Sequence, residues 1–275
     1  MRFRKIYVEI SNLCNLRCAF CPGTRRTPGR MTPEDFEKLL PKLRPYTDYL
    51  YFHIMGEPLC HPHLATFLEM AGDFGFRVIL TTNGTLLAKQ QEVLLEADSL
   101  HKVNISLHAF EANDLAVPFQ QYLEDCFQFG KAAEGKKLVV YRLWNHGGAD
   151  TRNGEIIASM ERFFQKPWTE VRQGMRIGEK VFLEYGDKFD WPDLNAPESG
   201  ASFCYGLRDQ LGVLWDGTVV PCCLDHEGDL ALGNLFRQEM EEILDGPRAK
   251  AIYEGFSRKE AVEDLCRRCG YAKRF

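Results

Sequence analysis

The chain has 275 residues, of which 45% are hydrophobic and 27% are charged, and its formal net charge at pH 7 is −5. This composition is typical of an ordinary globular protein, and the negative charge excludes a general attraction to nucleic acid or anionic lipid. No apolar run approaches the roughly 18 residues that a membrane-spanning helix requires. Residues 1–10 have basic side chains but lack the apolar core and cleavage site of a secretion signal. We therefore expect a cytoplasmic protein with no nucleic-acid or membrane partner.

Short apolar strands alternate with amphipathic helices over roughly the first half of the chain. The expected strands are residues 5–10, 48–54, 76–81, 102–107 and 137–143. The first expected helix begins after Thr32, which can cap it. Three more are expected at residues 62–74, 86–97 and 113–134. This alternation predicts parallel strands that are joined by right-handed helical crossovers.

Beyond residue 145 the pattern predicts only short elements. They are a helix at 155–164, strands within 170–185, a linker at 190–200 and helices at 236–245 and 247–256. Asp216-Gly217 separates two apolar runs and predicts a hairpin, because glycine accepts the positive φ that such a turn needs. We place the boundary between two parts of the chain near residue 195.

Polar side chains alternate with apolar ones along the expected strands. Asn104, Ser106 and His108 share one face of the fourth strand. The matching faces of the other strands carry Tyr7 and Glu9, Tyr51 and His53, and Arg142 and Trp144. If these faces point inward, the strands enclose a polar reaction chamber, in which His53, His108 and Arg142 are candidate catalytic or substrate-contacting residues. The alternative is a set of half-exposed strands, although parallel sheets are usually covered on both faces.

Ten cysteines need an explanation in a chain that is expected in the reducing cytoplasm. Disulfides are rare in that compartment, so metal binding or catalysis explains them better. Three cysteines lie at positions 14, 18 and 21, and five lie after residue 200. Cys60 and Cys126 stand alone and are expected to be ordinary packed or surface thiols.

Cys14, Cys18 and Cys21 lie on the expected loop after the first strand, at the carboxyl end where β/α folds place their chemistry. Three thiolates can bind three irons of a 4Fe–4S cluster, which usually has four cysteine ligands. No fourth cysteine is near in sequence, so one iron is left open, as in catalytic metal sites. A zinc knot is the alternative, and its fourth ligand would have to come from a distant residue such as His53.

The motif Cys14-x3-Cys18-x-Phe20-Cys21 resembles the signature of radical S-adenosylmethionine (SAM) enzymes. The resemblance implies that the open iron binds the amino and carboxylate groups of SAM. One electron from the reduced cluster then cleaves SAM to methionine and a 5′-deoxyadenosyl radical, which abstracts hydrogen from a substrate. In this family the aromatic residue before the third cysteine contacts the adenine, a role that falls to Phe20 here.

Three further segments resemble motifs of the same family. Gly56-Glu57-Pro58 follows the second strand, and the resemblance implies that Glu57 accepts a hydrogen bond from the SAM amino group. Asn83 belongs to a turn that lies near SAM in the family, and Ser106 occupies a strand position that usually meets the ribose or carboxylate. Arg142 or Asn145 is a weaker candidate for the SAM carboxylate.

The later cysteines resemble the SPASM and shorter twitch extensions of radical SAM enzymes. The pattern Cys204-x12-Gly217-x4-Cys222 fits the opening of these extensions, and Cys266-x2-Cys269 follows it. The resemblance implies one auxiliary 4Fe–4S cluster, which we expect to be held by Cys204, Cys222, Cys266 and Cys269. Cys223 could exchange roles with Cys222, and a structural zinc site with four thiolates is the alternative to the cluster.

We therefore expect an α/β fold, with a partial (β/α)6 TIM-like barrel at residues 1–195 and a small SPASM/twitch-like extension at 196–275. The resemblance implies a radical SAM enzyme that receives electrons from a flavodoxin- or ferredoxin-type donor and abstracts hydrogen from a substrate. A peptide or protein is the expected substrate. Oxidation of a small-molecule alcohol is the alternative within enzymes, and a zinc-stabilised non-enzymatic binding protein is the alternative outside them.

Overall fold

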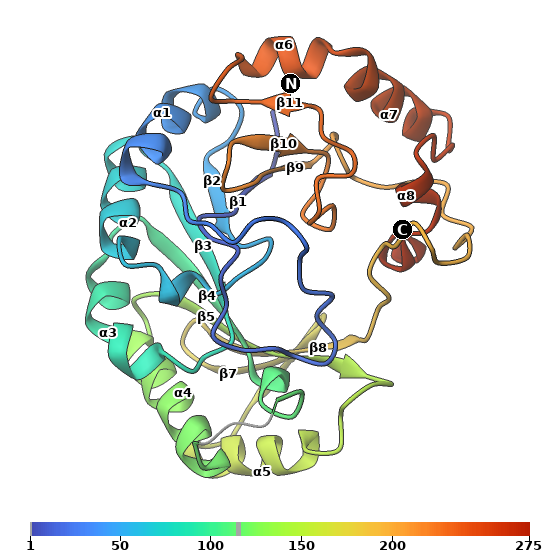
Figure 1. Cartoon of the computed structure of the whole chain (residues 1–275). Coiled ribbons are helices and arrows are strands. Elements are labelled where there is room, and N and C mark those ends of the chain that lie inside the picture. Colours follow the sequence, from blue (N-terminus) through green and yellow to red (C-terminus); the bar gives the residue numbers. More distant parts are fainter. Residues whose placement is uncertain (1, 114–116) are drawn as a thin grey trace.

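Figure 1 shows a computed structural model of the chain, which describes residues 2–113 and 117–275. The strands within these residues form one sheet in the order β11-β10-β9-β1-β2-β3-β4-β5-β8-β7-β6. The parallel strands are β9 (Gln210–Val213), β1 (Lys5–Val8), β2 (Tyr49–Phe52), β3 (Arg77–Thr82), β4 (Leu100–Ser106), β5 (Leu138–His146) and β8 (Val181–Asp187). The antiparallel strands at the two edges are β10 (Thr218–Val220), β11 (Gly233–Asn234), β7 (Gly174–Gly178) and β6 (Thr169–Val171).

Helices cover the outer, convex side of the curved sheet (Figure 1). Those of the barrel are α1 (Pro33–Leu43), α2 (Leu64–Asp73), α3 (Leu87–Glu96), α4 (Phe119–Ala133) and α5 (Asn153–Phe163). Those of the C-terminal part are α6 (Met240–Asp245), α7 (Pro247–Ser257) and α8 (Asp264–Arg267). The Thr32 side chain accepts a hydrogen bond from Asp35 N at 3.1 Å, so the predicted cap of α1 is confirmed. The helix predicted from residue 113 begins at Phe119, and residues 114–116 lie outside the described residues.

The sheet curves without closing, because its edge strands β11 and β6 do not pair with each other. Strands β1 to β5 and β8 with their helices form the expected partial (β/α)6 barrel. The C-terminal part extends this barrel: β9 pairs in parallel with β1, from Lys5 beside Gln210 to Val8 beside Val213. The boundary predicted near residue 195 falls in a stretch without helix or strand between β8 and β9, and the division into two domains stays a prediction. None of the described helices is both long and apolar enough to cross a membrane.

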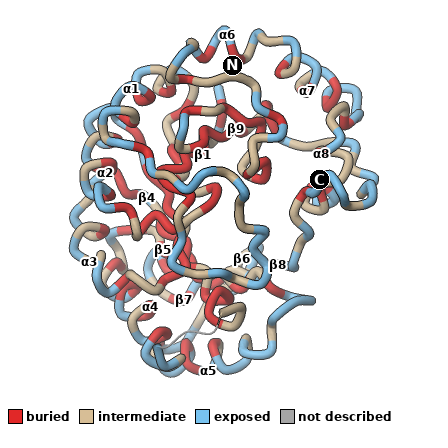
Figure 2. The backbone as a smooth tube through the Cα atoms, viewed as in Figure 1, coloured by how far each residue is buried: buried red, intermediate tan, exposed pale blue. Residues whose placement is uncertain are grey.

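The two faces of the sheet have opposite chemistry, as the alternation predicts. Val103 and Ile105 are fully buried against the outer helices. Figure 2 shows the resulting buried layer along the strands and the exposed outer surface of the helices. The concave face surrounds a cavity of about 530 Å³. The predicted inward side chains that line it are Tyr7, Tyr51, His53, Asn104, Ser106, His108, Arg142 and Trp144, so the polar chamber is confirmed.

Candidate active site

The loop between β1 and α1 carries the first three cysteines and crosses the mouth of the barrel (Figure 1). Asn12 joins the two ends of this loop, since its side chain donates to Thr27 O at 2.9 Å and accepts from Gly29 N at 2.8 Å. The Cys14 and Cys21 thiols are exposed, and the Cys18 thiol is partly exposed. The three thiols are therefore free to bind a group at the carboxyl ends of the strands.

Asparagines from distant parts of the chain donate hydrogen bonds to two of these sulfurs. Asn113 Nδ2 lies 3.1 Å from Cys18 Sγ, and Asn83 Nδ2 lies 3.9 Å from Cys14 Sγ. Such bonds orient and tune thiolate ligands of iron–sulfur clusters. Burial raises the pKa of the Cys14 thiol to about 11, so a bound iron would have to displace its proton. Three thiols on one loop, two of them with N–H···S partners, fit a cluster with three protein ligands, and the contact of Asn113 was not predicted from the sequence.

The Gly56-Glu57 turn is packed directly against the end of β1. Gly56 has φ +77°, and a Cβ at this position would lie only 2.3 Å from Ser11 O, so only glycine fits. The buried Glu57 carboxyl group accepts from Leu59 N at 3.0 Å and from Asn83 N at 2.7 Å. Burial raises its pKa to about 7. Glu57 thus ties the turns after β2 and β3 together, while its predicted contact with SAM remains a prediction.

Phe20 and His108 lie side by side at the outer end of the cavity. Their ring centroids are 5.0 Å apart, and Ser106 lines the same space. Strand β4 ends at Ser106, so His108 lies on the short 3-10 turn η2 (Leu107–Ala109) and not on the strand. Asn145 does not line this cavity, because its side chain is hydrogen-bonded to Ala149 O and to the Asn153 side chain.

Three buried polar atoms of residues that line the cavity have no hydrogen-bond partner within the described residues. They are His53 Nδ1, Asn104 Oδ1 and Arg142 Nε, and each is buried. Burial together with the positive charge of Arg142 lowers the pKa of His53 to about 3, so its ring is neutral at pH 7. Unsatisfied buried polar atoms are costly, so a small shift of these side chains would let them bind water or a polar ligand in the cavity.

The inner part of the cavity contains, beside the predicted Arg142, charged residues that were not predicted from the sequence. Lys102 of β4 and Arg142 of β5 lie at 4.0 and 3.6 Å from the carboxylate oxygens of Glu184 on β8. The Arg142 guanidinium lies 4.3 Å from the centroid of the Trp144 ring. Lys5 lies 5.9 Å from the ring centroids of Tyr7 and Tyr51. The two-residue period that identified Asn104 and Ser106 also includes Lys102, so this signal was present in the sequence.

A buried ion pair connects the cysteine loop, the first strand and the C-terminal part. Arg26 donates to both carboxylate oxygens of Glu9, at 2.9 and 2.6 Å, and its Nε donates to His226 O at 2.6 Å. Glu9 also accepts from Met55 N at 3.3 Å and from Trp215 N at 3.4 Å. The loop that presents the first cysteines is therefore held from both the β2 side and the hairpin of the C-terminal part.

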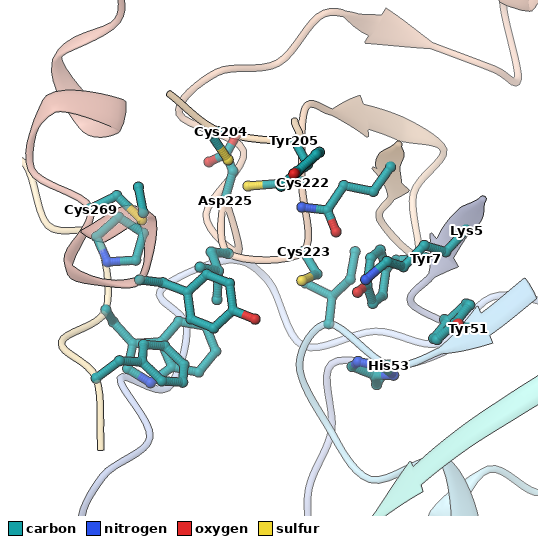
Figure 3. Close-up of a pocket in the computed structure, with 18 of the residues that line it drawn as sticks. Lys5, Tyr7, Tyr51, His53, Cys204, Tyr205, Cys222, Cys223, Asp225 and Cys269 are labelled. Carbon is teal, nitrogen blue, oxygen red and sulfur yellow. The ribbon is translucent and has the colours of Figure 1, made fainter. Parts of the chain in front are cut away.

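The later cysteines gather at the other end of the cavity (Figure 3). Cys204, Cys222, Cys266 and Cys269 come from three segments, and all four line the cavity. Burial raises the pKa of the Cys222 thiol, and the nearby thiols of Cys204 and Cys266 raise it further. Gly206 N donates to Cys204 Sγ at 3.4 Å, which is again a contact suited to a thiolate ligand.

Cys223 points in a different direction from Cys222. In Figure 3 the Cys222 sulfur lies beside Cys204, whereas the Cys223 sulfur lies on the side of Tyr7. Cys223 packs against the small apolar cluster that contains Tyr7. Adjacent residues in an extended chain have opposite side-chain directions, which explains the separation. The geometry favours Cys222 as the ligand.

The arrangement of the thiols also bears on the choice between iron and zinc. Within the described residues, no three His, Cys, Asp or Glu side chains form a group suited to one metal ion. Thiolates of a 4Fe–4S cluster bind different irons, so they lie farther apart than the ligands of a single zinc ion.

Comparison with known protein families gives two matches. Residues 8–126 match the radical SAM superfamily, and residues 204–270 match the SPASM iron–sulfur cluster-binding domain. The chain is also 24% identical to the S-adenosyl-L-methionine-dependent 2-deoxy-scyllo-inosamine dehydrogenase of Niallia circulans, over 97% of this chain and 92% of that protein.

Two solved structures have a similar fold. The structure of BtrN in complex with AdoMet and 2-DOIA has a TM-score of 0.62 at 21% identity, and covers 98% of this chain and 94% of that chain. The structure of Streptococcus suis SuiB bound to precursor peptide SuiA has a TM-score of 0.62 at 14% identity. This match covers 99% of this chain and 73% of the SuiB chain. The chain therefore contains a radical SAM domain at residues 8–126 and a SPASM iron–sulfur cluster-binding domain at residues 204–270.

Proposed function

We propose that this radical SAM enzyme oxidises a small hydroxyl-bearing molecule in the cavity between its two cysteine sites. The observation that carries the proposal is the set of three unpartnered polar atoms, on His53, Asn104 and Arg142, in one cavity of about 530 Å³. The similarity to a dehydrogenase extends over 97% of the chain and supports the same reaction class.

The outer end of the cavity would hold the cluster and SAM. Cys14, Cys18 and Cys21 are the proposed ligands, and Phe20, Glu57, Asn83 and Ser106 are the proposed SAM-binding residues. When bound, the cluster and SAM supply one-electron cleavage of SAM and abstraction of a hydrogen atom. Asn83 and Asn113 hold the sulfurs of Cys14 and Cys18 by hydrogen bonds, and Glu57 fixes the backbone of Asn83.

The residues at the centre of the cavity would bind and orient the alcohol. Arg142 Nε donates to a substrate oxygen, and Asn104 Oδ1 accepts from a hydroxyl group. His53 is neutral at pH 7, so its ring can hydrogen-bond to the reacting hydroxyl group. Its low pKa prevents it from keeping the proton that the hydroxyl loses, which passes to solvent. The alcohol carbon loses one hydrogen atom, the hydroxyl oxygen loses one proton, and one electron leaves, so that a carbonyl group forms. His108 stays neutral as well, since burial lowers its pKa to about 4.

The electron would leave by way of the auxiliary site. Cys204, Cys222, Cys266 and Cys269 are the proposed ligands of a single auxiliary 4Fe–4S cluster. The Cys222 thiol is buried and lines the same cavity as His53 and Arg142, so an acceptor held there is shielded from water and close to the substrate. A flavodoxin- or ferredoxin-type protein of the cytoplasm is the proposed partner that exchanges electrons with the enzyme.

A peptide or protein substrate, which the sequence favours, takes second place. SuiB, which shares the fold, was solved with a precursor peptide. At 14% identity this likeness concerns the fold alone. A peptide would have to insert one side chain into the cavity, with the rest of its chain outside.

The test uses anaerobically purified protein with dithionite and SAM, and hydrogen donors taken from cells grown in deuterated medium. The extract is separated into a fraction below about 1 kDa and a fraction of larger peptides and proteins. Deuterium in the 5′-deoxyadenosine product from the small fraction supports the proposal, and a new carbonyl group should be trapped there by a hydrazine reagent. Deuterium from the large fraction alone would instead establish a macromolecular substrate.

A further inference from the structure

The inner part of the cavity has more positive than negative charge. Lys5 from β1, Lys102 from β4 and Arg142 from β5 line it, and we call these three residues the cationic floor. Glu184 from β8 is the carboxylate that contacts them, at 3.6 Å from Arg142 Nε and 4.0 Å from Lys102 Nζ. One carboxylate for three cations leaves an excess of two positive charges in a partly buried place.

The positively charged groups of the cationic floor lack close carboxylate partners. Arg142 Nε is buried and makes no hydrogen bond within the described residues, since 3.6 Å from Glu184 is too long for one. The Lys5 ammonium contacts the faces of Tyr7 and Tyr51 rather than a carboxylate. Burial lowers the pKa of Lys102, Glu184 opposes this shift, and the positive charges of Arg142 and Lys5 add to it, so these cations repel one another. Burying like charges together is costly unless an anion offsets them.

The other acids of the cavity do not balance this excess. Asp209 pairs with Arg4 at 3.7 Å. Asp225 lies near the auxiliary cysteines, and its carboxylate accepts from Asp229 N and Leu230 N at 2.9 and 3.0 Å. Lys188 adds a further positive charge at an exposed position on the rim.

The cationic floor also does not serve chiefly to offset negative charge at the two cysteine sites. The ion pairs of Lys102 and Arg142 go to Glu184, and Lys5 contacts the rings of Tyr7 and Tyr51, so none of these contacts is with a proposed ligand cysteine. Lys5 lies at the first residue of β1 and Lys102 at the third residue of β4, whereas the proposed SAM-binding residues follow the carboxyl ends of the strands.

We propose that the substrate carries an anionic group, a carboxylate or a phosphate, which Lys5, Lys102 and Arg142 bind at the inner end of the cavity. This inference rests on the proposed function and narrows its substrate class to hydroxyl-bearing anions. With the anionic group on the floor, the remainder of the molecule extends past Asn104 and His53 towards Ser106 and the cysteine loop. The floor thereby orients the carbon that reacts.

The experiment measures anion binding directly and needs no turnover. Fully iron-loaded enzyme is saturated with SAM and titrated by calorimetry with inorganic phosphate, with malonate and with the cation ethanolamine. Phosphate or malonate should bind, and the tighter of the two identifies the anionic group. Lys102→Met should weaken that binding about tenfold or more, because a charge-assisted contact is lost. Lys102→Arg should retain most of it.

The matched control is Lys136→Met, which removes an exposed lysine just before β5. It should leave anion binding unchanged, and iron content and circular dichroism verify that every variant is folded. The inference is overturned if neither anion binds, if ethanolamine binds as tightly, or if Lys102→Met binds like Lys136→Met. Binding that disappears when SAM is added would also overturn it, since the floor would then be the site of the SAM carboxylate. A failure of the deuterium test with intact anion binding would count against the proposed function alone.

Discussion

The two cysteine sites differ in how the chain brings their thiols together. Cys14, Cys18 and Cys21 lie on one loop, and two of these thiols are exposed. The auxiliary thiols come from three segments between residues 204 and 269 and meet only after the hairpin and the last helices are packed. The first site is a local property of the sequence, whereas the second is a product of tertiary structure.

The largest effect is expected at the first site. Cys14→Ala should abolish 5′-deoxyadenosine formation from SAM, because two thiolates do not hold a cluster with one open iron. About four irons per chain should remain, those of the auxiliary site. The measurement combines product analysis by liquid chromatography with iron and sulfide determination.

Cys60→Ala is the control for that variant, since Cys60 is a partly exposed cysteine of the turn after Glu57 with no proposed ligand role. It should keep about eight irons and full SAM cleavage. Continued SAM cleavage by Cys14→Ala would contradict the assignment of the first site.

The next effect concerns the auxiliary site. Cys222→Ser should lose about four irons, whereas Cys223→Ser should keep them, because the Cys223 thiol faces Tyr7 and not the other cysteines. Iron analysis and Mössbauer spectroscopy distinguish the two variants. The reverse pattern would show that the two neighbours exchange roles when the cluster binds.

A third prediction concerns the ion pair that joins the two regions. Glu9→Gln leaves Arg26 largely buried without a counter-charge, which typically costs about 3 kcal/mol or more. The apparent melting temperature should fall by about 5–10 °C in scanning calorimetry. Glu239→Gln removes the exposed partner of Lys42 and should change it by less than about 2 °C. Equal effects of the two substitutions would mean that Glu9 does not join the regions.

The smallest effect is a dependence of stability on pH near the first site. His61 is buried, its Nε2 lies 3.1 Å from Met31 O, and its Nδ1 accepts from His63 N at 3.2 Å. Burial lowers its pKa to about 4, below the unfolded value of about 6.5. Between these values the unfolded chain binds more protons, so stability is lost as pH falls. At pH 5.5 the loss attributable to His61 should be about 1 kcal/mol.

Thermal unfolding at pH 7.5 and 5.5 measures this loss. His61→Gln should lose less stability than the unaltered protein over this interval. His146→Gln, at an exposed position, should follow the unaltered protein. If His61→Gln shows the same loss, the buried ring does not contribute to the pH dependence.

Local patterns were sufficient for much of the fold. Each of the five expected strands and the hairpin at Asp216-Gly217 is present, since two-residue alternation and turn chemistry depend only on near neighbours. The start of the 113–134 helix and the place of His108 were less well predicted, because element ends depend on packing with other segments.

Spacing along the chain was enough to predict the first cysteine group, the order of strands and helices and the inward polar face. Only the tertiary structure placed Asn113 beside Cys18, Glu9 beside Arg26, and Cys222 rather than Cys223 among the auxiliary thiols. It also gathered Lys5, Lys102 and Arg142 into one floor. The physical reason is that these contacts join residues from separate strands and loops, whose distances are fixed by how the sheet curves and by which edge of β1 the strand β9 occupies.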